Sequence, residues 1–161
     1  LVTPLRYDTR MLDDIDSKLI TALQENAQLT SQELAERLGL SASQAARRRQ
    51  RLEAQGVIKG YRAELSATEL GLGVQAFVQV QLTSHAPAHS ASFNKLIKSQ
   101  PEIVSAWTMT GDADLLLRIY SRDLISLNDL IHNILLPHGA VGRVHSQIVM
   151  SQIKQDAPLP A

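Results

Sequence analysis

The sequence predicts an α+β protein in which an N-terminal helix-turn-helix domain precedes a C-terminal ferredoxin-like βαββαβ domain. Three observations lead to this fold class. Amphipathic helical segments follow one another at the start of the chain, apolar and polar residues alternate over residues 74–82, and four arginines lie between Arg47 and Arg51. We expect the first domain, with a linker strand, at residues 1–62 and the second at residues 63–161.

Length and composition exclude several classes of protein. A chain of 161 residues buries roughly 70% of its unfolded surface, so its core needs no metal or disulfide. The absence of cysteine excludes a thiolate nucleophile and a Cys-ligated zinc site. No apolar run reaches the ~18 residues of a membrane span, and the first ten residues lack the apolar segment of a secretion signal. We therefore expect a cytoplasmic protein without a membrane segment or cofactor.

The distribution of charge is more informative than its sum. The formal net charge is zero, with ten basic against eight acidic residues through Arg62 and six against eight beyond it. An asymmetry this small does not identify a partner. The tight cluster of arginines is the feature that needs an explanation.

Three start signals mark the helices of the first domain. Each is a capping residue followed three positions later by a side chain that can return to the cap. We predict a helix over residues 14–25, a second of about two turns that stops at Gly39, and a third that ends near Ala54. Two short helices joined by a glycine-containing turn are typical of a helix-turn-helix. The capping pairs are Asp13 with Asp16, Thr30 with Glu33, and Ser41 with Gln44.

The second domain follows a change of hydrophobic period from 3.6 to 2. Even-numbered residues of 74–82 are apolar and predict a strand with one buried face, and a helix around Phe93 follows. Strands over 102–110 and 115–120 flank a turn, and a strand over 141–153 closes the domain. Two helices then cover one face of an antiparallel sheet, and the other face needs a partner. The helix over 123–135 has the apolar stripe Leu124, Leu127, Leu130, Ile131 and Ile134.

The third helix has one buried and one outward side. At 100° per residue, Ala45 and Leu52 share the line that packs on the other helices. Arg49 lies roughly 60° from this line, so we expect its stem on the domain surface with only its head group free. The opposite side carries Ser43, Arg47, Gln50 and Arg51, with Gln44 and Arg48 on its flank.

The outward residues suit a helix that enters the major groove of double-stranded DNA. Gln can pair with adenine and Arg with guanine, while neighbouring arginines neutralise phosphates. The free N–H groups at the start of this helix also favour a phosphate. A solvated basic helix is the alternative, but its position in a helix-turn-helix favours DNA contact. The predicted DNA-binding residues are Ser41, Ser43, Gln44, Arg47, Arg48 and Arg51.

An enzyme is one alternative function, because Asp112 and Asp114 form a carboxylate pair. General acid and base catalysis also needs a polarising group and a reactive partner, and the chain offers no coherent set. Aspartates in a Gly-Asp-x-Asp turn commonly bond to their own backbone. We therefore expect no enzymatic activity. A sensing module without DNA binding is a further alternative, against which the arginine helix argues.

Metal binding is the remaining alternative. His85 and His89 are four residues apart, the spacing of two ligands on one helix face, but they lie where a helix has barely begun. No carboxylate or thiolate stands beside them, so we expect no metal site. The other histidines, His132, His138 and His145, have no ligand spacing.

The order of elements resembles that of the Lrp/AsnC family of bacterial and archaeal regulators, also called feast/famine proteins. The likeness is carried by "LDDIDSKLITALQENAQLTSQELAERLGLSASQAARRRQRLEAQGVIKGY" and "TGDADLLLR", and it covers about residues 12–154. The resemblance implies a sequence-specific transcriptional regulator whose DNA binding or assembly responds to a small effector, often an amino acid. It also implies homodimers that assemble further, for example to octamers.

The resemblance places the effector in a cleft between dimers, at the turn of Gly111, Asp112 and Asp114. A bound zwitterion needs an anion for its ammonium group, which either aspartate can supply, and N–H donors for its carboxylate, as at Gly111. Trp107 and Met109 are expected in the core or an interface. The predicted effector-binding residues are Thr108, Gly111, Asp112, Asp114, Ser146, Ile148 and Val149.

Three positions depart from the family pattern. Ala27-Gln28 stands where the family usually has Gly-Arg, so one phosphate contact is missing. Arg49 stands where an apolar residue is usual, and "PHGAV" at 137–141 replaces the common Pro-Gly-Val.

Overall fold

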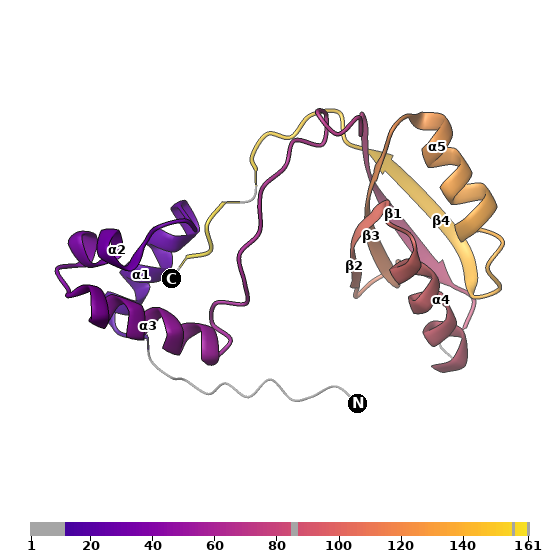
Figure 1. Cartoon of the computed structure of the whole chain (residues 1–161). Coiled ribbons are helices and arrows are strands. Elements are labelled where there is room, and N and C mark those ends of the chain that lie inside the picture. The colour runs from indigo at the N-terminus through magenta and orange to yellow at the C-terminus, as the bar shows by residue number, and fades with distance from the viewer. Residues whose placement is uncertain (1–11, 85–86, 156, 161) are drawn as a thin grey trace. The chain divides into compact units, whose positions relative to one another are not determined.

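The computed structural model describes residues 12–84, 87–155 and 157–160, and it contains two compact units. One unit is formed by the chain up to Ala63 together with Lys154–Ala161, and the other by Glu64–Ile153. The chain therefore passes from one unit to the other twice (Figure 1). The first unit contains α1 (Asp14–Glu25), α2 (Ser31–Leu38) and α3 (Ala42–Ala54).

The three helices of the first unit begin and end where the sequence predicts. Each of the three predicted capping pairs forms a complete capping box, in which the cap and the third helical residue exchange hydrogen bonds. Gly39 ends α2 in the left-handed region, with φ of 66°, which glycine adopts without strain. Leu19, Leu34, Ala45 and Leu52 are completely buried between the helices, which confirms the predicted seam of α3.

The second unit contains a four-stranded antiparallel sheet of β1 (Val74–Leu82), β2 (Ile103–Thr108), β3 (Leu115–Ser121) and β4 (Val141–Ile148). The strand order is β2-β3-β1-β4. The even-numbered residues Ala76, Val78 and Val80 of β1, one of the two central strands, are completely buried. The helices pack against them through residues that include Phe93 and Leu127. Both helices therefore cover one face of the sheet (Figure 1). The predicted fold class is confirmed. The helices are α4 (Pro87–Ser99), α5 (Leu124–Asp129) and η1 (Leu130–Leu135).

The last helix departs from the predicted apolar stripe because it changes from α to π geometry. In η1 the N–H of Leu136 donates to the carbonyl of Ile131, five residues earlier, at 2.9 Å. A π turn holds more residues than an α turn, so it brings Leu135 onto the buried line and moves Ile134 partly off it. The prediction is also wrong for Leu124, which is 56% exposed in the first turn of α5.

Among the described residues of the second unit, no helix packs on the second face of the sheet. Alternation along β1 and β3 turns Phe77, Leu116 and Tyr120 toward this face, where they are half-buried. Trp107 and Met109 are 45% and 46% exposed, so they do not belong to the core of one chain. We call this surface the open face.

No helix among the described residues is long and apolar enough to cross a bilayer. Residues 1–10, which we expected to lack a secretion signal, lie outside the described residues, as does His85 of the considered histidine pair.

Candidate nucleic-acid interface and ligand pocket

The outward side of α3 is exposed as predicted. Ser43, Arg47, Gln50 and Arg51 are all exposed, whereas Ala45 and Leu52 on the opposite side have no exposed surface. The local geometry thus presents a row of polar and basic side chains. Their contacts decide which of them can reach a ligand.

Two of the clustered arginines bind carboxylates of α1. Arg48 donates through Nη1 to Asp13 at 2.6 Å and to Asp16 at 2.8 Å, and Arg51 donates to the other carboxylate oxygen of Asp16. The Asp16 side chain is only 4% exposed, so its charge is buried against two guanidinium groups. A buried carboxylate requires such partners. The Arg48 hydrogen bond also lowers the pKa of Asp13.

Arg47 differs from these two. Its side chain projects from the exposed side of α3, and no ion pair joins it to any other part of the chain that the structure describes. Of the three arginines predicted to bind DNA, Arg47 is therefore the one whose charge the described residues do not offset.

Arg49 is fixed by three neighbours, so the expectation of a free head group is wrong. It donates through Nη1 to the carbonyl of Leu29 at 3.1 Å and through Nε to Glu53 at 3.1 Å and to the Tyr61 hydroxyl at 2.9 Å. Its guanidinium carbon also lies 4.6 Å from the centre of the Tyr61 ring. The hydroxyl of Tyr61 and then Arg49 lower the pKa of Glu53. Arg49 ties α3 to the turn before α2 and to the segment after α3.

The start of α3 holds the remaining predicted DNA contacts. The Ser41 hydroxyl lies 3.1 Å from that of Ser43, and the side-chain oxygen of Gln44 accepts the Ser41 N–H at 2.9 Å. Gln44 thus uses its carbonyl oxygen for the cap, and its amide NH₂ is the group that can face a base.

The turn between β2 and β3 contains the predicted effector aspartates, which have different environments. Asp114 accepts the N–H of Leu82 through its carboxylate at 2.7 Å, and its own N–H donates to Val80 at 3.0 Å. These bonds fasten the turn to the end of β1. Asp112 is exposed, and Gly111 before it has φ of 109°, a value that favours glycine.

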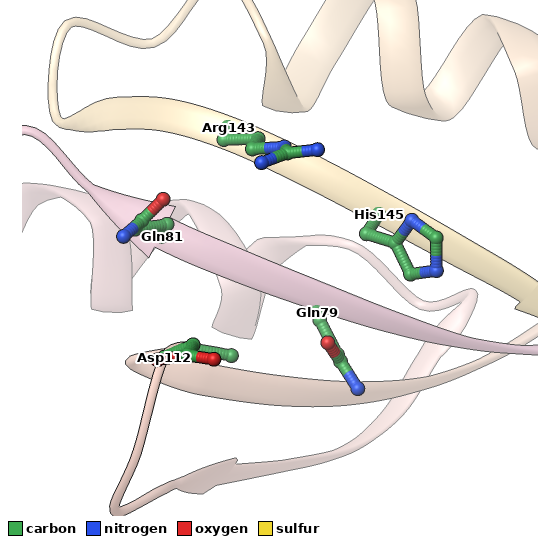
Figure 2. A pocket seen from close by; sticks show the side chains of 6 residues that line it. Gln79, Gln81, Asp112, Arg143 and His145 are labelled. Atoms are coloured by element: carbon green, nitrogen blue, oxygen red, sulfur yellow. The ribbon is translucent and has the colours of Figure 1, made fainter.

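A cavity of about 220 Å³ lies between this turn and the open face of the sheet. Side chains from β1, from β4 and from the turn surround it (Figure 2). Asp112 contributes a carboxylate and Arg143 a guanidinium, so the same small space is bordered by groups of opposite charge. The lining residues are Gln79, Gln81, Asp112, Ala113, Arg143 and His145.

A single chain does not gather all of the predicted effector residues. Thr108 lies on β2 and Ser146 and Ile148 on β4, and these strands form opposite edges of the sheet. Ile148 also pairs with Ala76 near the start of β1, whereas the turn contacts its end. Of the predicted set, only Asp112 lines the cavity.

Sequence reasoning missed Arg143 and His145 as candidate site residues. They alternate along the last strand, which places them on one face, and this pattern is visible in the sequence. The register that sets His145 beside Gln79 is a property of the folded sheet. The described residues contain no group of three or more side chains suited to a metal ion.

Both units of the chain match known protein families. Residues 12–59 match a winged helix-turn-helix DNA-binding family, and residues 75–159 match the Lrp/AsnC ligand binding domain. The chain belongs to the Lrp/AsnC family. It is a transcriptional regulator with a DNA-binding domain and a ligand-binding domain.

Similar Lrp/AsnC proteins match over most of their length. The leucine-responsive regulatory protein of Rhizobium meliloti (strain 1021) is 37% identical, covering 89% of this chain and 92% of that protein. The DNA-binding transcriptional activator DecR of Escherichia coli (strain K12) is 32% identical, covering 93% and 99%. A Neisseria meningitidis transcriptional regulator, solved as a complex with L-Met, is 36% identical with a TM-score of 0.88, covering 92% and 96%. These relatives are transcriptional regulators, which agrees with the prediction that the chain is not an enzyme.

Proposed function

We propose that this regulator binds a free amino acid in the cavity beside the Gly111–Asp114 turn, and that binding changes its affinity for DNA or its assembly. The observation that carries the proposal is that Asp112 and Arg143 line the same small cavity. The carboxylate can accept an ammonium group and the guanidinium can donate to a carboxylate, so together they complement a zwitterion. The cavity is smaller than the ~300–1,000 Å³ of pockets for drug-sized ligands, as suits a small metabolite.

Asp112 is the better ammonium acceptor of the two aspartates. The carboxylate of Asp114 already holds the Leu82 N–H, whereas Asp112 is exposed and borders the cavity. The backbone at Gly111 adds N–H donors in this proposal. The effector residues predicted at the sheet edges would join the site only from a second copy of the chain: Thr108, Ser146, Ile148 and Val149. The L-Met complex of the Neisseria meningitidis relative supports an amino acid as the class of ligand.

We further propose that the residues of α3 have different roles in DNA binding. Arg47 faces base edges and phosphates, and Ser41, Ser43 and Gln44 approach the DNA with the N-terminus of the helix. Arg48 and Arg51 keep Asp16 as a partner and offer their remaining N–H groups to phosphates. We assign DNA binding to residues 1–62 and effector binding with assembly to residues 63–161, in a cytoplasmic protein.

Assembly is proposed through the open face. Exposed Trp107 and half-buried Phe77, Leu116 and Tyr120 lie on a face that no element of the second unit covers among the described residues. Pairing of two such faces buries these rings and forms a homodimer, from which octamers and other higher oligomers can assemble. A light-scattering mass equal to one chain at micromolar concentration contradicts this assignment.

The effector proposal is tested by thermal melting of the full chain with each of the twenty amino acids. A ligand present at 100 times its dissociation constant adds about 2.7 kcal/mol to the free energy of unfolding. We expect at least one amino acid to raise the melting temperature, and Asp112→Asn and Arg143→Gln each to abolish the rise. Asp129→Asn, an exposed aspartate on α5, is the control and keeps the full shift. The proposal fails if no amino acid stabilises the protein, or if both cavity variants retain the shift.

A further inference from the structure

Within the first unit, the C-terminal segment of the chain contacts α1 through a pair of hydrogen bonds. The side-chain amide of Gln24, on α1, donates to the carbonyl of Leu159 at 3.0 Å, and its oxygen accepts the Leu159 N–H at 2.6 Å. The two residues are 135 positions apart in the sequence. One glutamine side chain thus satisfies both backbone groups of one residue, as a neighbouring strand does in a sheet.

The contact lies at a groove in the first unit. A cavity of about 430 Å³ is bordered by α1, by the segment that follows α3 and by the C-terminal segment itself. Most of the lining side chains are apolar, and among them Leu12, Val57 and Tyr61 are 38–44% exposed. The chain brings Leu159 and Pro160 to this groove.

The composition of the C-terminal segment suits this groove. It reads Ala157-Pro158-Leu159-Pro160, and prolines on both sides of Leu159 restrict the backbone to extended conformations. A segment that is already extended loses less conformational entropy when it binds. Prolines also lack the N–H group, so Leu159 carries the backbone donor that Gln24 can accept.

We propose that residues 157–160 form a latch that docks the C-terminus of the chain on its own DNA-binding domain, with Gln24 as the receptor residue. The strand β4 ends at Ile148, and residues 149–156 connect it to the latch. The DNA-binding domain is then attached to the ligand-binding sheet at two points, through the linker after α3 and through the latch. A second attachment raises the effective concentration of one domain around the other without further contacts.

The latch is suited to opening. Leu159 is 76% exposed, so its attachment rests mainly on the paired hydrogen bonds with Gln24. Segments with few buried apolar contacts open at low free-energy cost, as regulatory elements must. Loss of either partner therefore releases the latch without unfolding the helices beneath it.

Chemical cross-linking tests the latch in the full chain, because the sequence contains no cysteine of its own. Ala27→Cys and Pro160→Cys place two thiols on the groove while Gln24 and Leu159 stay intact. A short bis-maleimide is expected to join them within one chain, which gives a cross-linked species of single-chain mass. Lys18→Cys, outside the groove, combined with Pro160→Cys is the matched control and gives a low yield. Adding Gln24→Ala to the first pair is expected to reduce the yield on the order of tenfold, from the loss of two hydrogen bonds.

Hydrogen exchange provides the second measurement. Deletion of residues 157–161 and Gln24→Ala are each expected to speed exchange in residues 57–62 by a similar factor, and the combined variant by no more. Gln28→Ala, an exposed glutamine outside the groove, leaves exchange unchanged. The proposal is overturned if cross-linking yields a double-chain mass, which indicates docking on a second copy. It is equally overturned if yield and exchange are indifferent to Gln24.

Discussion

Charged side chains have different roles in the arginine cluster on α3 and in the cavity on the open face. On α3, Arg48 is paired with acidic groups of α1, although it belongs to the densest run of positive charge in the sequence. On the sheet, Asp112 and Arg143 are distant in sequence, and the fold brings both to one cavity. A run of like charge is thus partly structural, while the candidate binding site is built from dispersed residues. Ligand binding should therefore depend most on charged side chains that lie beside a cavity or on an exposed surface.

The largest effect expected from this comparison is on stability, at the buried carboxylate of α1. Asp16→Asn removes the charge that two guanidinium groups bind, and we expect the free energy of unfolding to fall by about 2 kcal/mol. Urea unfolding followed by circular dichroism measures the change. Asp14→Asn, an exposed neighbour on α1, is the control and changes it by less than about 0.5 kcal/mol. Equal stability of both variants would show that the buried ion pairs do not hold α3 to α1.

The next largest effect is on DNA binding, to which we expect Arg47 and Arg48 to contribute differently. We expect Arg47→Ala to weaken specific binding about tenfold, to relax the base preference, and to make the salt dependence shallower by about 0.9. Arg48→Ala is expected to lower stability first and to change the salt dependence less, because Asp13 and Asp16 already bind its guanidinium. Binding titrations at several salt concentrations, with specific and random duplexes, measure both. Identical losses for the two variants would contradict the distinction.

The smallest effect is the loss of stability in acid. The pKa of Asp13 is lowered by Arg48, that of Glu33 by the backbone of Thr30, and that of Glu53 by the Tyr61 hydroxyl. A carboxyl group with a lowered pKa in the folded state contributes stability above its unfolded pKa, and this is lost as pH falls. We expect nearly constant stability between pH 5 and 8 and a decline below about pH 4. Asp13→Asn should make the acid decline shallower in urea unfolding, and an unchanged decline would refute the contribution of this pair.

In the first unit, local sequence patterns predict the helix ends and the buried side of α3, but they do not predict the long-range partners of its arginines. The caps of its helices and the buried line of α3 were predictable because each depends on residues three or four positions apart. The partners of Arg48 and Arg49 were not, since Asp16 and Tyr61 lie 32 and 12 positions away. The sequence of one helix does not indicate which carboxylate of another helix will lie beside its arginines.

In the second unit, the sequence predicts which face of a strand is buried, but it does not predict the register in which strands pair. Alternation along the sequence determined which face of β1 is buried, and the order of elements determined the βαββαβ fold and its open face. Only the folded sheet decided that Arg143 and His145 stand near Asp112, because strand pairing sets which positions of distant segments are neighbours. The latch at Gln24 has the same origin, since its two halves lie near opposite ends of the chain. The sequence by itself determined the helices, the strands and their buried faces through short-range periodicity, and long-range packing decided which charges are neutralised and which surround a cavity.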